Sequence, residues 1–80
     1  MQYQKEKWVF NLWKSDTRLY VGEVKQDLFG QWILHLTWGG LHNRLGNSKT
    51  VMAETYEDAT TLMEKVAKRR IAHGYRLVGY

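Results

Sequence analysis

The segment TYEDATTLMEKVAKRRIAHG, residues 55–74, decides the fold, because here the apolar spacing changes from that of a strand to that of a helix. Apolar side chains recur every three or four residues, which places them in one stripe along a helix. Thr55 is a candidate N-cap with Asp58 three residues later, and Gly74 is a natural C-terminal stop. The pattern predicts one long helix over about residues 56–73. The predicted stripe consists of Ala59, Leu62, Met63, Val66, Ala67 and Ile71, with Tyr56 at its edge.

One charged residue of this helix, Arg70, breaks the pattern, because it falls inside the apolar stripe. The long stem of an arginine can lie across apolar surface while its guanidinium sits at the edge. The guanidinium could also reach back toward the loop after Trp38. The opposite helix face is polar and carries Asp58, Thr61, Lys65 and Lys68.

Three segments before the helix alternate as β-strands do, at residues 8–13, 18–24 and 31–38. In the first, WVFNLW, one side carries Trp8, Phe10 and Leu12. In the third, QWILHLTW, a single face carries Trp32, Leu34, Leu36 and Trp38.

The connections and the chain end complete the expected topology. Residues 14–17 (KSDT) and 25–31 (KQDLFGQ) hold turn-forming residues, so successive strands can pair antiparallel. We expect a shorter strand near residues 50–53 and an extended C-terminal segment, residues 75–80, along the domain edge. The predicted class is α+β: one domain, residues 1–80, with an antiparallel sheet of about three to five strands and one long helix packed on one face.

The composition restricts the kind of protein. Four Trp, five Tyr and two Phe among 80 residues give a short chain the large rings that a compact core needs. There is no cysteine, hence no disulfide and no thiolate metal site, which suits a reducing cytoplasm. No apolar run approaches the ~20 residues of a membrane span, and the N-terminus has no apolar signal region. We therefore expect a cytoplasmic protein without a membrane partner.

The charge is unevenly distributed. The formal net charge is +4, and no acidic residue follows Glu64. A basic patch suits an anionic partner such as nucleic acid. Acids in the first turn and bases in the last turn also complement the helix dipole without any partner, so both interpretations stay open. The basic residues after Glu64 are Lys65, Lys68, Arg69, Arg70 and Arg76.

The stretch LTWGGLHNRLGNSKT, residues 36–50, does not have the pattern of a core strand throughout. A nucleotide-binding P-loop needs Lys and Ser or Thr directly after its second glycine. Here five residues separate Gly40 from Gly46 and Lys49 comes three residues after Gly46, with no helix starting there. We exclude a P-loop.

Catalytic and metal sites also lack their residues. The imidazoles His35, His42 and His73 have no thiol partners, and the spacing of the first two matches no common ligand pair. No serine stands in a nucleophile elbow and no carboxylate pair lies in an apolar strand; Glu23 is the only strand acid. The sequence predicts no enzyme, no metal and no cofactor.

Two interpretations of residues 36–50 remain. An aromatic residue at a strand end, glycines that allow close backbone approach, and Asn, Arg and Lys around them suit a sugar-phosphate backbone. Equally, the stretch can be a turn-rich connection whose Trp38 completes the core.

The motif residues resemble the WGR domain family. The resemblance covers about residues 18–75 and rests on DLFGQWILHLTWGG (27–40), Gly46 with Lys49, EDA (57–59) and AKRRIAHGY (67–75). The chain looks like a small stand-alone bacterial member of this family, which also occurs inside poly(ADP-ribose) polymerases. The resemblance implies an antiparallel sheet crossed by a helix. It also implies binding near a DNA break, with the motif Trp against a terminal sugar and basic groups on phosphates.

The match to the motif is incomplete. Trp38 and Gly39 fill its first two positions, but Gly40 stands where the family has Arg, and His42 where it has the next glycine. Arg70 falls where the family has a helix lysine.

Two functional hypotheses follow. The first is a non-enzymatic nucleic-acid-binding module, with DNA the expected nucleic acid. The second is a protein-interaction or regulatory module that keeps the fold but has lost DNA binding with the motif Arg. The candidate nucleic-acid-binding residues are Trp38, Gly39, Arg44, Lys49, Lys65, Lys68, Arg69 and Arg70.

Overall fold

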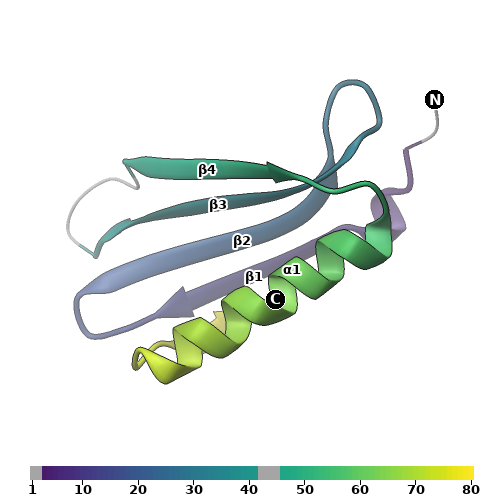
Figure 1. Ribbon diagram of the computed structural model, residues 1–80. Helices are drawn as coiled ribbons and strands as arrows, with labels where there is room; N and C mark the ends of the chain where they lie inside the picture. The colour runs from purple at the N-terminus through teal and green to yellow at the C-terminus, as the bar shows by residue number, and fades with distance from the viewer. Residues whose placement is uncertain (1–2, 42–45) are drawn as a thin grey trace.

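One antiparallel sheet and one helix make up the protein (Figure 1). The structure is a computed structural model that describes residues 3–41 and 46–80. The five strands lie in the order β4-β3-β2-β1-β5, and the helix packs mainly against β2 and β3. This confirms the predicted α+β class. The elements are η1 (Lys5–Lys7), β1 (Val9–Lys14), β2 (Arg18–Gln26), β3 (Trp32–Gly40), β4 (Asn47–Met52), α1 (Tyr56–Ala72) and β5 (Arg76–Gly79).

The strand register aligns aromatic residues across the sheet. In the pairing of β2 with β3, Tyr20 lies opposite Trp38, and in the pairing of β1 with β2 it lies opposite Trp13. Opposite residues of an antiparallel pair point to the same face. Three large rings from three strands therefore form one row. The C-terminal segment forms β5 at the sheet edge beside β1, as predicted.

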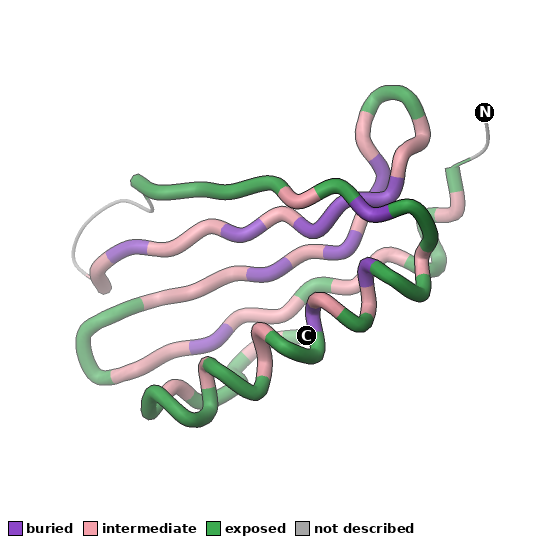
Figure 2. Tube along the Cα trace, in the orientation of Figure 1, coloured by how far each residue is buried: buried purple, intermediate pink, exposed green. Residues whose placement is uncertain are grey.

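The helix covers the face of the sheet that the alternation of residues 31–38 predicts to be apolar. Leu34 is 2% exposed and Trp32 and Leu36 are also buried, so the predicted face of residues 31–38 is the core face. In β1 the covered residue is Trp13, at 1% exposed, whereas Phe10 is 46% exposed on the opposite face. The alternation of residues 8–13 shows only which side chains lie on the same face of the strand. The pairing of Trp13 with Tyr20 in β2 places Trp13 on the face that the helix covers. Figure 2 shows buried residues on β1, β2, β3 and α1, while β4 is mostly exposed.

Gly22 lets the helix approach the sheet closely. A Cβ atom at this position would lie 2.8 Å from the Met63 sulfur and 3.0 Å from Cζ3 of Trp13. Contacts this short would force the neighbouring side chains apart. The absence of a side chain at Gly22 therefore fixes how near the middle of α1 lies to the sheet.

Both predicted helix ends are confirmed. The Thr55 hydroxyl accepts a hydrogen bond from the Asp58 backbone N–H at 3.0 Å. At the other end, Gly74 has a φ of 86°, and the backbone N–H of Tyr75 donates to the Arg70 carbonyl at 2.9 Å. This combination is a Schellman ending, which turns the chain sharply toward β5.

The apolar stripe ends differently from the prediction. Ile71 was expected to be part of it, but its side chain is 58% exposed. Arg70 follows Met63 by seven residues, close to two helical turns, and so points to the sheet in its place. The inward residue of the last turn is thus the arginine.

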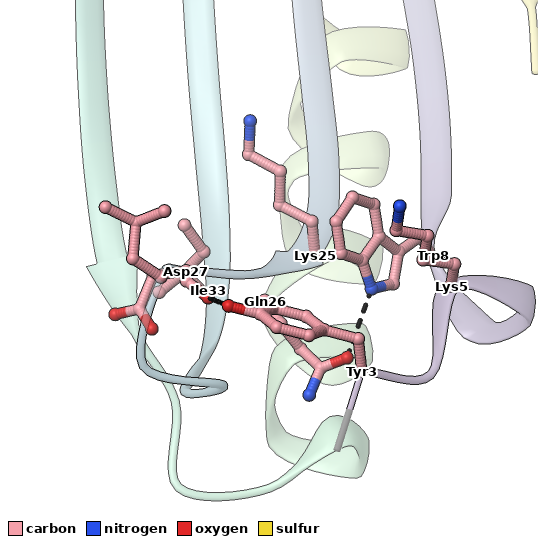
Figure 3. A pocket seen from close by; sticks show the side chains of 8 residues that line it. Tyr3, Lys5, Trp8, Lys25, Gln26, Asp27 and Ile33 are labelled. Atoms are coloured by element: carbon pink, nitrogen blue, oxygen red, sulfur yellow. Dashed lines mark hydrogen bonds between the residues drawn. The ribbon is translucent and has the colours of Figure 1, made fainter. Parts of the chain in front are cut away.

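The buried side-chain amide of Gln26, at the end of β2, anchors the N-terminal segment to the sheet (Figure 3). Gln26 is 7% exposed, and its Oε1 accepts from the Gln4 backbone N–H at 2.7 Å and from Trp8 Nε1 at 3.3 Å. The Tyr3 hydroxyl donates to the Asp27 carbonyl at 2.9 Å. These bonds close one side of a hollow of about 480 Å³ beside the β2–β3 turn.

We predict that Gln26→Met lowers the free energy of unfolding by about 1–3 kcal/mol, because it leaves the donors of Gln4 and Trp8 without this acceptor. Denaturant unfolding followed by tryptophan fluorescence measures the change. Gln4→Ala is the control, since it keeps the backbone N–H, and it should cost less than about 0.5 kcal/mol. Equal unfolding midpoints for the two variants would contradict the anchoring role.

Candidate nucleic-acid interface

A groove lies between α1 and the β3–β4 side of the sheet. It encloses about 260 Å³ and has an apolar floor and a basic rim. Both elements contribute to each part, so the groove exists only in the folded domain. The floor residues are Leu34, Leu36, Val51, Leu62 and Val66, with Tyr20 and Trp38 at one end. The rim residues are Lys49, Lys65, Arg69 and Arg70.

Trp38 is held by a neighbouring ring. Its indole stacks on Tyr20 with 5.6 Å between ring centroids and 12° between planes. The strand register brings the two rings together, and Trp38 is only partly buried. Its remaining surface lines the groove. One part of the ring therefore completes the packing and another part faces the groove.

Arg70 packs on the same tyrosine. Its guanidinium carbon lies 4.2 Å from the centroid of the Tyr20 ring and 5.1 Å from that of Tyr75. The two tyrosine rings meet edge to face, at 6.2 Å. Among the described residues, the buried Nε of Arg70 has no hydrogen-bond partner. The cation is thus held by ring faces, and it joins the last turn of α1 to the centre of the sheet.

The other rim cations have no ion pair. In residues 3–41 and 46–80, the one ion pair joins Lys25 to Glu23 at 3.9 Å, on the opposite face of the sheet. Lys49, Lys65 and Arg69 are exposed. Three positive charges around one concave surface attract an anion, and the apolar floor strengthens this attraction. Arg69 and Arg70 also lie in the last turn of α1, where they complement the helix dipole.

The structure brings together five of the eight candidate site residues. Trp38, Lys49, Lys65, Arg69 and Arg70 all line the groove.

The remaining three candidates lie elsewhere. Lys68 is exposed on α1 but does not line the groove. Gly39 lies in β3 opposite Leu19, one residue after Trp38 and hence on the face away from the helix. Arg44 lies outside the described residues.

Sequence reasoning missed Tyr20 and Tyr75 as part of this site. Tyr20 supports both Trp38 and Arg70, and Tyr75 contacts Arg70 and Tyr20. Tyr20 could have been found from the hairpin that joins β2 to β3. The position of the turn fixes the pairing register of the two strands, and this register places Tyr20 opposite Trp38.

Comparisons of the chain with protein families, with curated proteins and with solved structures give no match. The WGR resemblance thus rests on the motif residues alone. In the described part of the chain, no helix has the length and apolar character needed to cross a membrane.

We predict a measurable coupling between Arg70 and Tyr20. In a double-mutant cycle of Arg70→Met and Tyr20→Leu, the coupling energy should be about 0.5–2 kcal/mol, because the substitutions remove a partly desolvated cation–π contact. Chemical denaturation of the four proteins measures it. Arg69→Met in the same cycle is the control, since Arg69 is exposed and contacts no ring in the described structure. A coupling for Arg70 no larger than that for Arg69 would exclude the contact as a support of the fold.

Proposed function

We propose that the protein is a non-enzymatic nucleic-acid-binding module of WGR type that holds a sugar-phosphate backbone in the groove. The observation that carries this proposal is the gathering of Lys49, Lys65 and Arg69, none of them ion-paired in the described structure, beside Trp38. Together with Trp38 they come from three different elements: Trp38 from β3, Lys49 from β4, and Lys65 and Arg69 from α1.

Each group has a defined role in this proposal. The two lysines and Arg69 contact phosphate oxygens, which supplies affinity without sequence specificity. The free part of the Trp38 indole stacks on a sugar or an unpaired base, a contact that tolerates any sequence. Tyr20 and Arg70 hold the indole in position. A strand end or a single-stranded stretch of DNA fits this arrangement, because an unpaired residue can reach the ring.

The sequence also suggests a place for this activity. A chain without cysteine forms no disulfide and needs no oxidising compartment. We therefore place the binding activity in the cytoplasm.

A protein-interaction role is the second candidate function. Gly40 replaces the family's motif Arg, which removes one cation from the expected phosphate site. In addition, β4 is an edge strand of the sheet and pairs with β3 alone among the residues that the structure describes. Loss of DNA binding with retention of the fold would leave this edge as the functional surface.

We predict that replacing Lys49, Lys65 and Arg69 together with Gln weakens DNA binding and flattens its salt dependence. The log–log slope should fall by roughly 0.7–0.9 for each lost phosphate contact. Fluorescence anisotropy with a single-stranded and a nicked oligonucleotide at several salt concentrations measures both quantities.

A triple variant of Lys5, Lys14 and Lys25, each changed to Gln, is the matched control. It removes the same charge from residues that do not line the groove, so it should keep most of the slope. If both triple variants lose the same slope, net charge and not the groove governs binding. If neither loses any, the proposal is wrong.

We further predict that Gly40→Arg strengthens DNA binding. Gly30 and Gly74 are the glycines with positive φ among the described residues, so the backbone at position 40 accepts a side chain. Position 40 shares the face of Trp38 by strand alternation, which brings the new guanidinium to the groove side. The same anisotropy titration measures the gain. Unchanged affinity in a folded variant would show that the missing Arg is not what limits binding.

A further inference from the structure

The outer edge of β4 is open. β4 is the last strand of the sheet on its side, and Asn47–Met52 pairs with β3 alone within the described chain (Figure 1). An open edge presents alternating N–H and C=O groups that can pair with another extended chain. The other edge strand, β5, is shorter, with four residues against six in β4. The β4 edge is thus the larger site for strand addition.

Two adjoining hollows form a depression on the helix side of this edge. Beside the groove lies a second hollow of about 340 Å³, and the two share Leu62 and Lys65. Because α1 packs mainly on β2 and β3, the helix side of β4 is left mostly uncovered, with Val51 alone among its residues half-buried. A chain added to β4 would direct every second side chain toward this depression. The second hollow is lined by Met52, Ala53, Glu54, Asp58, Thr61, Leu62 and Lys65.

The charges select the partner. Lys49, Lys65 and Arg69 point to the same side as the depression and have no ion pair in the described structure. Two copies joined edge to edge through β4 would bring both Lys49 side chains near the centre of the joint, and lysine on an edge strand opposes such pairing. Over the groove, a foreign strand with carboxylates on that face meets three cations instead, whereas the second hollow also holds the carboxylates of Glu54 and Asp58. The acidic residues of the partner therefore belong over the groove, where an apolar residue between them meets Leu62 and Val66.

We propose that the β4 edge is a strand-addition site for an extended segment of a partner protein, with acidic residues flanking an apolar residue on the face toward α1. Backbone hydrogen bonds to Asn47–Met52 supply the affinity and the groove supplies the specificity, as in other cases of β-augmentation. This site goes beyond nucleic-acid binding and does not depend on it, although both ligands would contact the same cations.

The probe is the synthetic peptide Thr-Glu-Thr-Leu-Thr-Glu-Thr with blocked ends, titrated into the full ¹⁵N-labelled chain. NMR shifts are expected for the amides of residues 47–52, with slowed hydrogen exchange at alternate positions. Methylating one alternate set of peptide amide nitrogens should abolish binding, while methylating the other set should be tolerated, because only one set faces β4. No binding up to about 1 mM peptide, or equal binding of the two methylated peptides, would overturn the proposal.

A charge reversal tests the chosen partner. The variant Lys65→Glu with Arg69→Glu should lose at least about tenfold in affinity for the acidic peptide and gain affinity for Thr-Lys-Thr-Leu-Thr-Lys-Thr. If the parent chain binds the lysine peptide as well as the acidic one, the charge selection is wrong.

Anisotropy titrations with DNA, done separately, keep this result distinct from the proposed function. A chain that binds the peptide but not DNA retains the strand-addition site and refutes nucleic-acid binding. A chain that binds DNA but not the peptide does the reverse. Where both bind, the peptide should displace DNA.

Discussion

The contact between the Arg70 guanidinium and the Tyr20 ring holds the candidate site together. Arg70 belongs to the last turn of α1 and Tyr20 to β2, inside the sheet, so their 4.2 Å contact fixes the height of the helix end above the strands. Tyr20 also stacks on Trp38. Placing a cation among rings removes part of its hydration, and a desolvated cation–π contact of about 2 kcal/mol offsets this cost. One interaction thus positions the helix, the groove and the indole.

The groove itself follows from the dimensions of the fold. Five strands spaced about 4.8 Å apart span roughly 19 Å between the outer axes, whereas one helix is about 10–12 Å wide. A single helix therefore cannot cover the whole sheet. Because Gly22 has no side chain, α1 can lie close to the middle of the sheet, where Met63 and Trp13 both lie next to this glycine. Part of the uncovered width lies beside β4, where it forms the groove, next to the edge at which the sheet ends.

The parts predictable from sequence are those encoded by local spacing. The caps at Thr55 and Gly74 and the core face of residues 31–38 could be identified because capping and alternation are local rules. The side of β1 that the helix covers could not, since alternation is symmetric until a register is known. The exposure of Ile71 also depends on tertiary structure, because Arg70 takes the inward position only with Tyr20 and Tyr75 in place.

The candidate site divides in the same way. Trp38 and the basic residues of α1 could be selected from the sequence by residue type and by resemblance. Lys49 lines the groove with them, whereas Lys68 does not. This difference follows from how β4 and α1 lie side by side. Nucleic acid and an acidic strand would use the same cations but treat the β4 edge differently. Phosphates accept hydrogen bonds and donate none, so they leave the edge carbonyls to water, whereas a peptide can satisfy both kinds of group. If the chain follows the WGR motif that it resembles, Gly40 leaves the proposed phosphate site with one cation fewer while the β4 edge is unchanged, which would favour the peptide.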